Sequence, residues 1–158
     1  MTPHDWGAMT VIEESIIIER PRAEVFDYAT DSERVLEWNR VATEYSATPT
    51  GAVTADTHVR GVSRVLGRDI RWAAKVADLR AGALVRWEST EADVPFTDYW
   101  LYEDVDGGTR VTFHQEFPSV GGPHVGRILD PIVSRVYGRG FKGNLARLKD
   151  RLEATANG

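Results

Sequence analysis

A histidine and a glutamate stand two positions apart in the segment TFHQEF, with a glutamine between them. The side chains of His114 and Glu116 are of the kinds that transfer protons in many enzymes, and Gln115 offers an amide that donates and accepts hydrogen bonds. Successive side chains of a strand point to opposite faces, so Phe113, Gln115 and Phe117 would share one face. We expect this more apolar face to look inward, with His114 and Glu116 towards solvent.

Other segments resemble catalytic or cofactor motifs but lack the context that those motifs need. GRGFKG, residues 138–143, has the glycine spacing of a dinucleotide-binding loop, yet it lies in a stretch of helical spacing with no strand before it. HQE has the H-x-E spacing of zinc deaminases, but the chain has no cysteine to complete such a site. The histidines are scattered along the chain: His4, His58, His114 and His124. We therefore expect no metal and no cofactor.

Length and charge restrict the class of protein further. A chain of 158 residues suits one domain with a sizeable core, and a net charge of −5 without a basic stripe argues against nucleic-acid binding. The start of the chain lacks the features of a signal peptide, and the apolar runs are too short to cross a bilayer. We expect a cytoplasmic monomer or homodimer without integral membrane association. Its single domain would span residues 10–155 after a flexible tail at 1–9.

The first part of the chain predicts one strand and two short helices. Residues 10–18 are rich in β-branched side chains, which favours a strand. Pro21 follows and suits the first turn of a helix, where a missing N–H costs nothing. A second short helix is expected over DSERVLEW, capped by Asp31 or Ser32.

From about residue 41 the apolar spacing changes to the alternation of strands. Short turn signals such as Leu66–Gly67, Ala81–Gly82 and the DGG at 106–108 separate the alternating segments, so the pattern predicts an antiparallel meander. The six expected strands cover residues 41–48, 57–65, 68–79, 83–90, 96–105 and 109–117.

The last part of the chain predicts one long amphipathic helix. Its apolar residues recur at helical spacing: Val125, Ile128, Leu129, Ile132, Val133, Val136, Tyr137, Phe141, Leu145, Leu148 and Leu152. Asp130 and Pro131 fit either a helix start or a proline kink, so the helix begins near His124 or at Pro131. Gly140 falls on the apolar face, where a small residue would admit a ligand or a closely packed strand.

Two segments carry a resemblance to a known superfamily. SIIIERPRAEVFDYATDSERVLEWNRV resembles the opening, and DVDGGTRVTFHQEF with the long last helix resembles the close, of the START-like, polyketide cyclase–dehydrase superfamily (SRPBCC). The resemblance implies the helix-grip fold of the α+β class: a curved seven-stranded antiparallel sheet wrapped around a long C-terminal helix, with two short helices after the first strand. Polyketide cyclases and aromatases, lipid-transfer domains and birch-pollen-type allergens belong to this superfamily, so the fold alone does not fix the function.

Strand alternation predicts an apolar cavity with a few polar groups, which is the usual form of a small-molecule site. In strand 96–105 both faces carry apolar groups, and we assign the face of Asp98 to the interior. The candidate ligand-binding residues are Trp38, Trp72, Trp87, Asp98, Trp100, Tyr102, Phe113, Gln115, Phe117, Tyr137 and Gly140. Trp38 ends the second short helix and is expected near the mouth. The alternative for Asp98 is a strand-end carboxylate that meets water.

Two functions remain open at this point. The first is binding of a hydrophobic small molecule that is aromatic, polycyclic or lipid-like, with Asp98, Gln115 and Tyr102 fixing its orientation. The second, implied by the resemblance, is a polyketide cyclase, aromatase or dehydrase that folds a reactive chain in the same cavity, where a carboxylate or phenol moves protons. A purely apolar lining would favour a carrier, and a second ionisable group beside Asp98 would favour an enzyme.

Overall fold

The protein is represented by a computed structural model that describes residues 9–119 and 122–156. The expected tail therefore lies outside the described residues, apart from Met9, which begins the first strand. In chain order the elements are β1 (Met9–Ile18), α1 (Arg22–Thr30), α2 (Val35–Trp38), β2 (Ala42–Thr48), β3 (His58–Val65), β4 (Arg68–Arg80), β5 (Leu84–Ala92), β6 (Thr97–Val105), β7 (Gly108–Pro118) and α3 (Gly122–Ala156).

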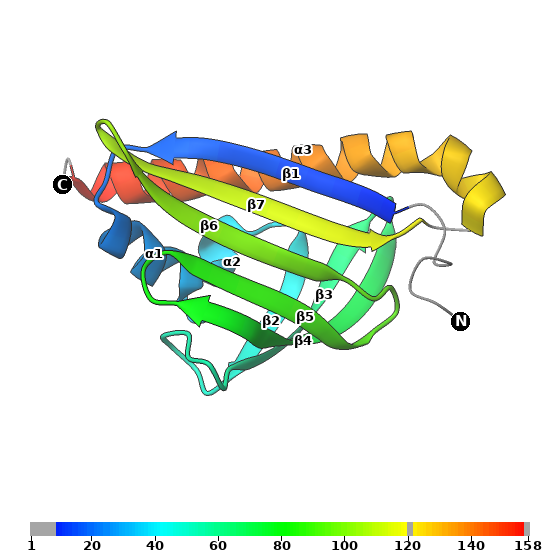
Figure 1. The fold of residues 1–158 in the computed structure, drawn as a ribbon, viewed down its shortest axis with the longest axis horizontal. Coiled ribbons are helices and arrows are strands. Elements are labelled where there is room, and N and C mark those ends of the chain that lie inside the picture. Colours follow the sequence, from blue (N-terminus) through cyan, green and yellow to red (C-terminus); the bar gives the residue numbers. More distant parts are fainter. Residues whose placement is uncertain (1–8, 120–121, 157–158) are drawn as a thin grey trace.

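Within the described residues the strands form one seven-stranded antiparallel sheet in the order β1-β7-β6-β5-β4-β3-β2. The first and last strands pair along their whole length, from Met9 opposite Pro118 to Ile18 opposite Thr109. The sheet curls into a half-barrel, and α3 runs along it beside β1 (Figure 1). The helix-grip fold expected from the sequence is confirmed. A curved sheet needs its apolar concave face covered, and the long helix covers it.

The long helix begins at Gly122 and continues through Pro131, which decides between the two expected starts. Its second half carries the apolar stripe that packs into the sheet, with Phe141, Leu145 and Leu148 buried. The side chains of the expected stripe before Pro131 lie outside the description.

The second short helix is shorter than expected, because α2 has one turn and begins at Val35. Neither Asp31 nor Ser32 caps it, so the predicted cap is wrong. The Asp31 carboxylate accepts a hydrogen bond from the Glu33 N–H at 3.0 Å. The Ser32 hydroxyl accepts one from the Gly51 N–H at 2.7 Å, which ties the turn to the loop after β2.

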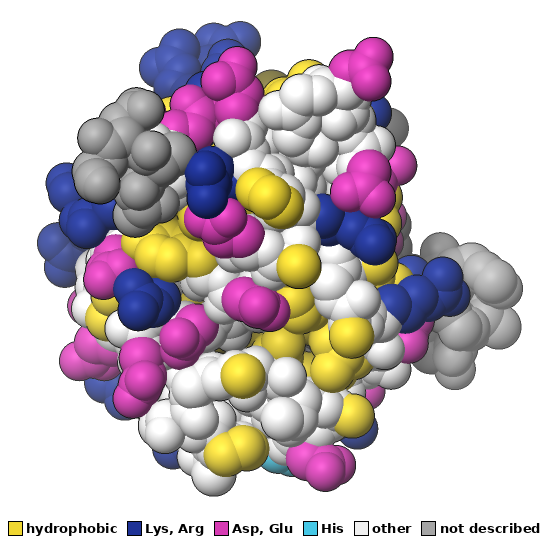
Figure 2. Space-filling view, turned by 90° about the vertical axis from the view of Figure 1, so that its left-hand side faces the viewer, with side chains coloured by type: hydrophobic (Ala, Val, Ile, Leu, Met, Phe, Trp, Pro, Cys, Tyr) yellow, Lys and Arg dark blue, Asp and Glu magenta, His cyan; other side chains and the backbone are white. Residues whose placement is uncertain are grey.

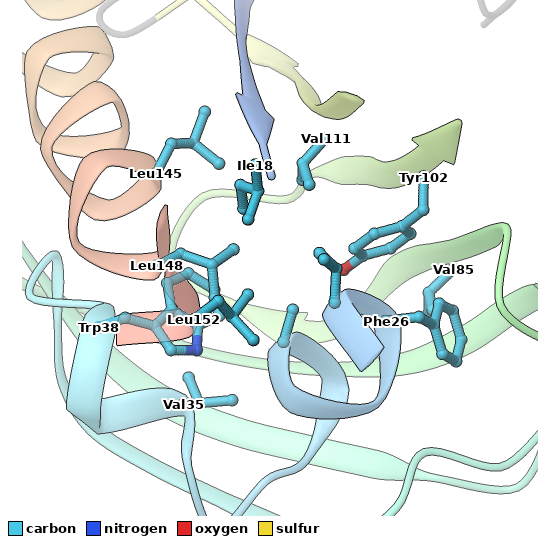
Figure 3. Close-up of a cluster of buried hydrophobic side chains, with 12 residues drawn as sticks. Ile18, Phe26, Val35, Trp38, Val85, Tyr102, Val111, Leu145, Leu148 and Leu152 are labelled. Atoms are coloured by element: carbon cyan, nitrogen blue, oxygen red, sulfur yellow. The ribbon is translucent and has the colours of Figure 1, made fainter. Parts of the chain in front are cut away.

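A hydrophobic cluster closes one end of the half-barrel (Figure 3). There α1 contributes Phe26, α2 contributes Val35 and Trp38, and α3 contributes Leu148 and Leu152. These side chains meet Ile18, Val85, Tyr102 and Val111 of the sheet. Figure 2 shows the outer surface of this end, where acidic and basic side chains are interspersed. Among the described residues, no helix has the length and apolar character needed to cross a membrane.

Candidate functional site

A cavity of about 520 Å³ lies inside the half-barrel. All the candidate residues except Gly140 line it: Trp38, Trp72, Trp87, Asp98, Trp100, Tyr102, Phe113, Gln115, Phe117 and Tyr137. The strand faces that alternation assigned to the interior are therefore the faces that line the cavity. The volume falls in the usual range of small-molecule sites, about 300–1,000 Å³.

Aromatic rings that support one another form one side of the wall. Trp100 makes an edge contact with Trp38, with ring centroids 5.5 Å apart, and lies 4.6 Å from Phe113. Phe113 in turn stacks on Phe141 of α3 at 4.0 Å. Each ring is held between neighbours, so the wall keeps its shape around the cavity.

Trp72 is held in place by two small residues of the neighbouring strand. Its indole N–H donates to the Ser63 hydroxyl at 2.9 Å. Gly61 lies directly opposite Trp72 in the sheet, and a Cβ on Gly61 would come within 2.6 Å of the indole ring. The ring therefore occupies the space that any other side chain at 61 would take.

Asp98 and Gln115 form the polar point of the wall. They are direct cross-strand partners on β6 and β7, and the Gln115 amide donates to Asp98 Oδ2 at 3.2 Å. Asp98 Oδ1 is buried and has no hydrogen-bond partner among the described residues. Burial raises the pKa of Asp98 to about 7, and the hydrogen bond from Gln115 offsets part of that rise. Asp98 is the second residue of β6, is partly exposed and lines the cavity, so the strand-end alternative stands beside the ligand-binding one.

Three tyrosines of the wall lie within the electrostatic influence of Asp98. Burial first, with the charge of Asp98 added, raises the pKa of Tyr45 and of Tyr137 well above the usual range. The pKa of Tyr102 is raised by burial, by Tyr45 and by Asp98. These phenols remain neutral around pH 7, so they contribute hydroxyl groups and no charge.

The rim of the cavity lies where exposed residues join the lining. Leu66 of the β3–β4 turn, with Arg68 and Asp69 at the start of β4, forms one part of it, and Asp93 of the β5–β6 connection forms another. Trp38 is only 2% exposed. It is a wall residue rather than the mouth residue expected from its place at a helix end, and its indole N–H is buried without a partner among the described residues.

His114 and Glu116 lie on the outer face of β7, as the alternation predicts. The His114 ring stacks on Tyr99 with centroids 4.8 Å apart, and its Nε2 is 3.3 Å from Glu116 Oε1. The His114 side chain keeps only 20% exposure, less than a solvent-facing histidine would have, because Tyr99 covers it. Neither residue lines the cavity.

Gly140 faces Val41, the residue just before β2. A Cβ on Gly140 would come within 2.8 Å of Val41 Cγ2. Its small size accommodates the side chain of Val41. Gly140 is not among the described residues that line the cavity, and no strand backbone that the structure describes lies within 4 Å of the position of its Cβ.

Some lining residues were absent from the sequence-based candidates. Tyr45 and Phe96 line the cavity, as do Ser63 and Phe141. Alternation in the segment 41–48 would have found Tyr45, because it shares a face with the buried Ala47. The role of Ser63 depends on Trp72 and is not visible from spacing. Among the described residues no group of histidine, aspartate and glutamate is placed to hold a metal ion.

The fold agrees with the comparisons to known proteins. The family of polyketide cyclase / dehydrase and lipid transport proteins matches residues 9–153. The chain belongs to this family and to the START-like superfamily. No curated protein matches the sequence.

Solved structures share the fold at low sequence identity. TTHA0849 from Thermus thermophilus is 20% identical, with a TM-score of 0.78 over 92% of this chain and 98% of its own. Zhui aromatase/cyclase from Streptomyces sp. R1128 is 16% identical, with a TM-score of 0.73 over 92% and 94%. A START superfamily protein from Mycobacterium smegmatis is 11% identical, with a TM-score of 0.71 over 92% and 99%.

Proposed function

We propose that the protein binds a hydrophobic small molecule, aromatic or lipid-like, inside the cavity. The observation that carries this proposal is a cavity of about 520 Å³ whose wall is mainly apolar, is rich in aromatic rings and includes one carboxyl–amide pair. Burial of ligand surface would supply most of the binding free energy, at about 25 cal/mol per Å² of apolar area. Membership of the polyketide cyclase / dehydrase and lipid transport family supports the same class of ligand.

The residues proposed to contact the ligand are the candidates that line the cavity. Trp72, Trp87 and Trp100 would pack on its rings, and Asp98 with Gln115 would fix its orientation. Trp38, Tyr102, Phe113, Phe117 and Tyr137 complete the proposed contact surface.

A matched pair of variants tests whether binding occurs in the cavity. Ala74 is buried in the wall on β4, and Ala77 is exposed on the same strand. An environment-sensitive apolar dye should bind the wild type and quench its tryptophan fluorescence. We expect Ala74→Leu to weaken dye binding at least about tenfold, about 1.4 kcal/mol, and Ala77→Leu to leave it unchanged.

Native mass spectrometry of the freshly purified protein would identify a ligand that co-purifies. If no dye enters the wild type, or if both leucine variants bind it equally well, the binding proposal is wrong. Thermal melts of both variants establish that they are folded. If Ala74→Leu does not fold, single replacements of Trp72, Trp87 and Trp100 by phenylalanine take its place, because each should alter the quenching.

A second candidate is an enzyme of the cyclase or dehydrase kind. It is favoured by the pKa of Asp98, which at about 7 suits proton transfer at neutral pH, and by the phenols of Tyr45 and Tyr137 that share its surroundings. The structural neighbour Zhui is named an aromatase/cyclase. An assay of cyclisation of a model poly-β-ketone tests this function. An enzyme should lose turnover in Asp98→Asn while it still binds the dye, whereas a carrier should show no turnover in either form.

A further inference from the structure

The buried pair Asp98 and Gln115 lies in the middle of an otherwise apolar row of the sheet. Trp87 on β5 is the direct partner of Asp98, and Asp98 is the direct partner of Gln115 on β7. Phe96, just before β6, and Trp100 flank Asp98 on the same face, and both line the cavity. Strand register therefore places one carboxyl group among aromatic rings on the wall.

The hydrogen bonds of this pair are incomplete. The amide of Gln115 donates to Oδ2 of Asp98, and Oδ1 has no partner among the described residues. An ionised carboxylate accepts several hydrogen bonds, and a buried acceptor without a donor is costly. Oδ1 is closed off from solvent in the described conformation, so a donor in the cavity reaches it only when the carboxyl rotates about its soft Cβ–Cγ bond. Water can supply the missing donor in the empty protein, so a ligand that expels this water must supply a donor of its own.

No positive charge among the described lining residues compensates Asp98. Arg68 is the one basic residue of that lining, and it is exposed at the rim beside Asp69. Inside the cavity the neighbouring ionisable groups are phenols, and these stay neutral because their pKa values are raised. The interior is therefore neutral when Asp98 is protonated and negative when it is ionised.

We propose that the cavity selects ligands whose inner end is a hydrogen-bond donor, an aromatic hydroxyl or a protonated amine, and discriminates against ligands that end in a carboxylate. This inference rests on the proposed binding function and specifies its ligand class. Aromatic rings of the wall take the apolar body of the ligand, and Asp98 receives the donor. A carboxylate at the same place would meet a like charge with no cation beside it.

The experiment uses probes that share one ring system and differ in one group. Naphthalene, 2-naphthol, 2-naphthylmethylamine, 2-naphthoate and 2-acetylnaphthalene are titrated into the protein by calorimetry at a pH above about 7, where Asp98 is largely ionised. We expect the naphthol or the amine to bind at least about tenfold more tightly than naphthalene, about 1.4 kcal/mol, and naphthoate to bind more weakly than naphthalene. A gain confined to naphthol identifies a hydroxyl as the preferred donor, and a gain confined to the amine identifies a cation.

The variant Asp98→Asn should reverse this order. The Gln115 amide must still donate to an oxygen, so the carbonyl oxygen of the new side-chain amide would take the place of Oδ2. The NH₂ group of the new side chain would then face the cavity as a donor. We expect 2-acetylnaphthalene and naphthoate to gain relative to naphthol in this variant. The control is Asp69→Asn, which removes a carboxylate of the exposed rim and should leave the order of the probes unchanged.

Two outcomes separate failure of this inference from failure of the proposed function. If all probes bind the wild type equally, or if Asp98→Asn keeps the naphthol preference, the donor selectivity is wrong while binding in the cavity stands. If neither the probes nor an apolar dye bind at all, the proposed function itself is wrong.

Discussion

Replacing Gly140 by alanine should destabilise the protein, although alanine is the better helix former. In an open helix the change would stabilise by about 0.8–1.0 kcal/mol. Here the new Cβ would come within 2.8 Å of Val41 Cγ2, and Val41 is a stiff, buried, β-branched side chain. Overpacking of this kind costs about 1–3 kcal/mol. The net expectation is a loss of up to about 2 kcal/mol.

The same helix offers two matched controls. A Cβ on Gly138 would lie 3.4 Å from Glu14 Oε1, and one on Gly143 would lie 3.4 Å from Arg147 Nη1. Both are ordinary contacts with long side chains that can shift. Gly138→Ala and Gly143→Ala should therefore keep the gain in helix propensity and stabilise by up to about 1 kcal/mol.

A double-mutant cycle with Val41→Ala isolates the contact itself. Removal of the Val41 methyl groups should turn Gly140→Ala from destabilising to stabilising, which corresponds to a coupling of about 1–3 kcal/mol. Urea unfolding followed by circular dichroism measures each free energy, and melting temperatures should follow at about 2–4 °C per kcal/mol. If Gly140→Ala stabilises as much as Gly138→Ala, or if its effect is unchanged beside Val41→Ala, the steric argument is refuted.

Three further predictions concern the cavity wall and the outer face. The pKa of Asp98 is raised from 3.8 to about 7 on folding, so the native state holds a proton that the unfolded state has lost, and stability should fall as pH rises between about 4 and 7. Asp98→Asn should flatten that decline in unfolding free energy relative to wild type, and equal slopes would contradict the burial of the carboxyl. His114→Gln should leave dye affinity within about tenfold, because the ring lies on the outer face against Tyr99; a larger loss would contradict that placement. Gly61→Ala should lower the melting temperature and shift tryptophan fluorescence, because its Cβ would come within 2.5 Å of the Glu44 carbonyl oxygen and 2.6 Å of the Trp72 ring; an unchanged emission spectrum would argue against the contact with Trp72.

The arrangement of strands and the long helix follows from the spacing of apolar residues. Alternation in TFHQEF placed Gln115 inward and His114 outward, and the same rule placed Trp72, Trp87 and Asp98 on the wall. These predictions succeed because a sheet with one buried face permits only one register of its apolar residues.

The spacing of apolar residues does not predict contacts between segments that lie far apart in the sequence. Gly140 was recognised as a small residue on the apolar face, but its neighbour Val41 lies 99 positions earlier in the chain. Ser32 is a good helix cap by type, yet its hydroxyl serves the N–H of Gly51 in the loop after β2. Trp38 ends a helix, which suggested a place near the mouth, but its side chain is buried and the Arg147 guanidinium of α3 donates to its carbonyl at 3.0 Å.

Contacts among the residues of the wall explain why the interior does not collapse onto itself. Trp72 is held over Gly61 by its bond to Ser63, and Trp100 is wedged between Trp38 and Phe113. Closing the cavity would require these rings to leave positions that other side chains define, which costs packing and one buried hydrogen bond. Under the proposed function the binding surface is therefore formed before a ligand arrives, and a ligand would gain affinity because little ordering of the wall remains to be done. In such a preformed apolar site the carboxyl of Asp98 would be the feature that distinguishes one ring-shaped ligand from another, as we propose.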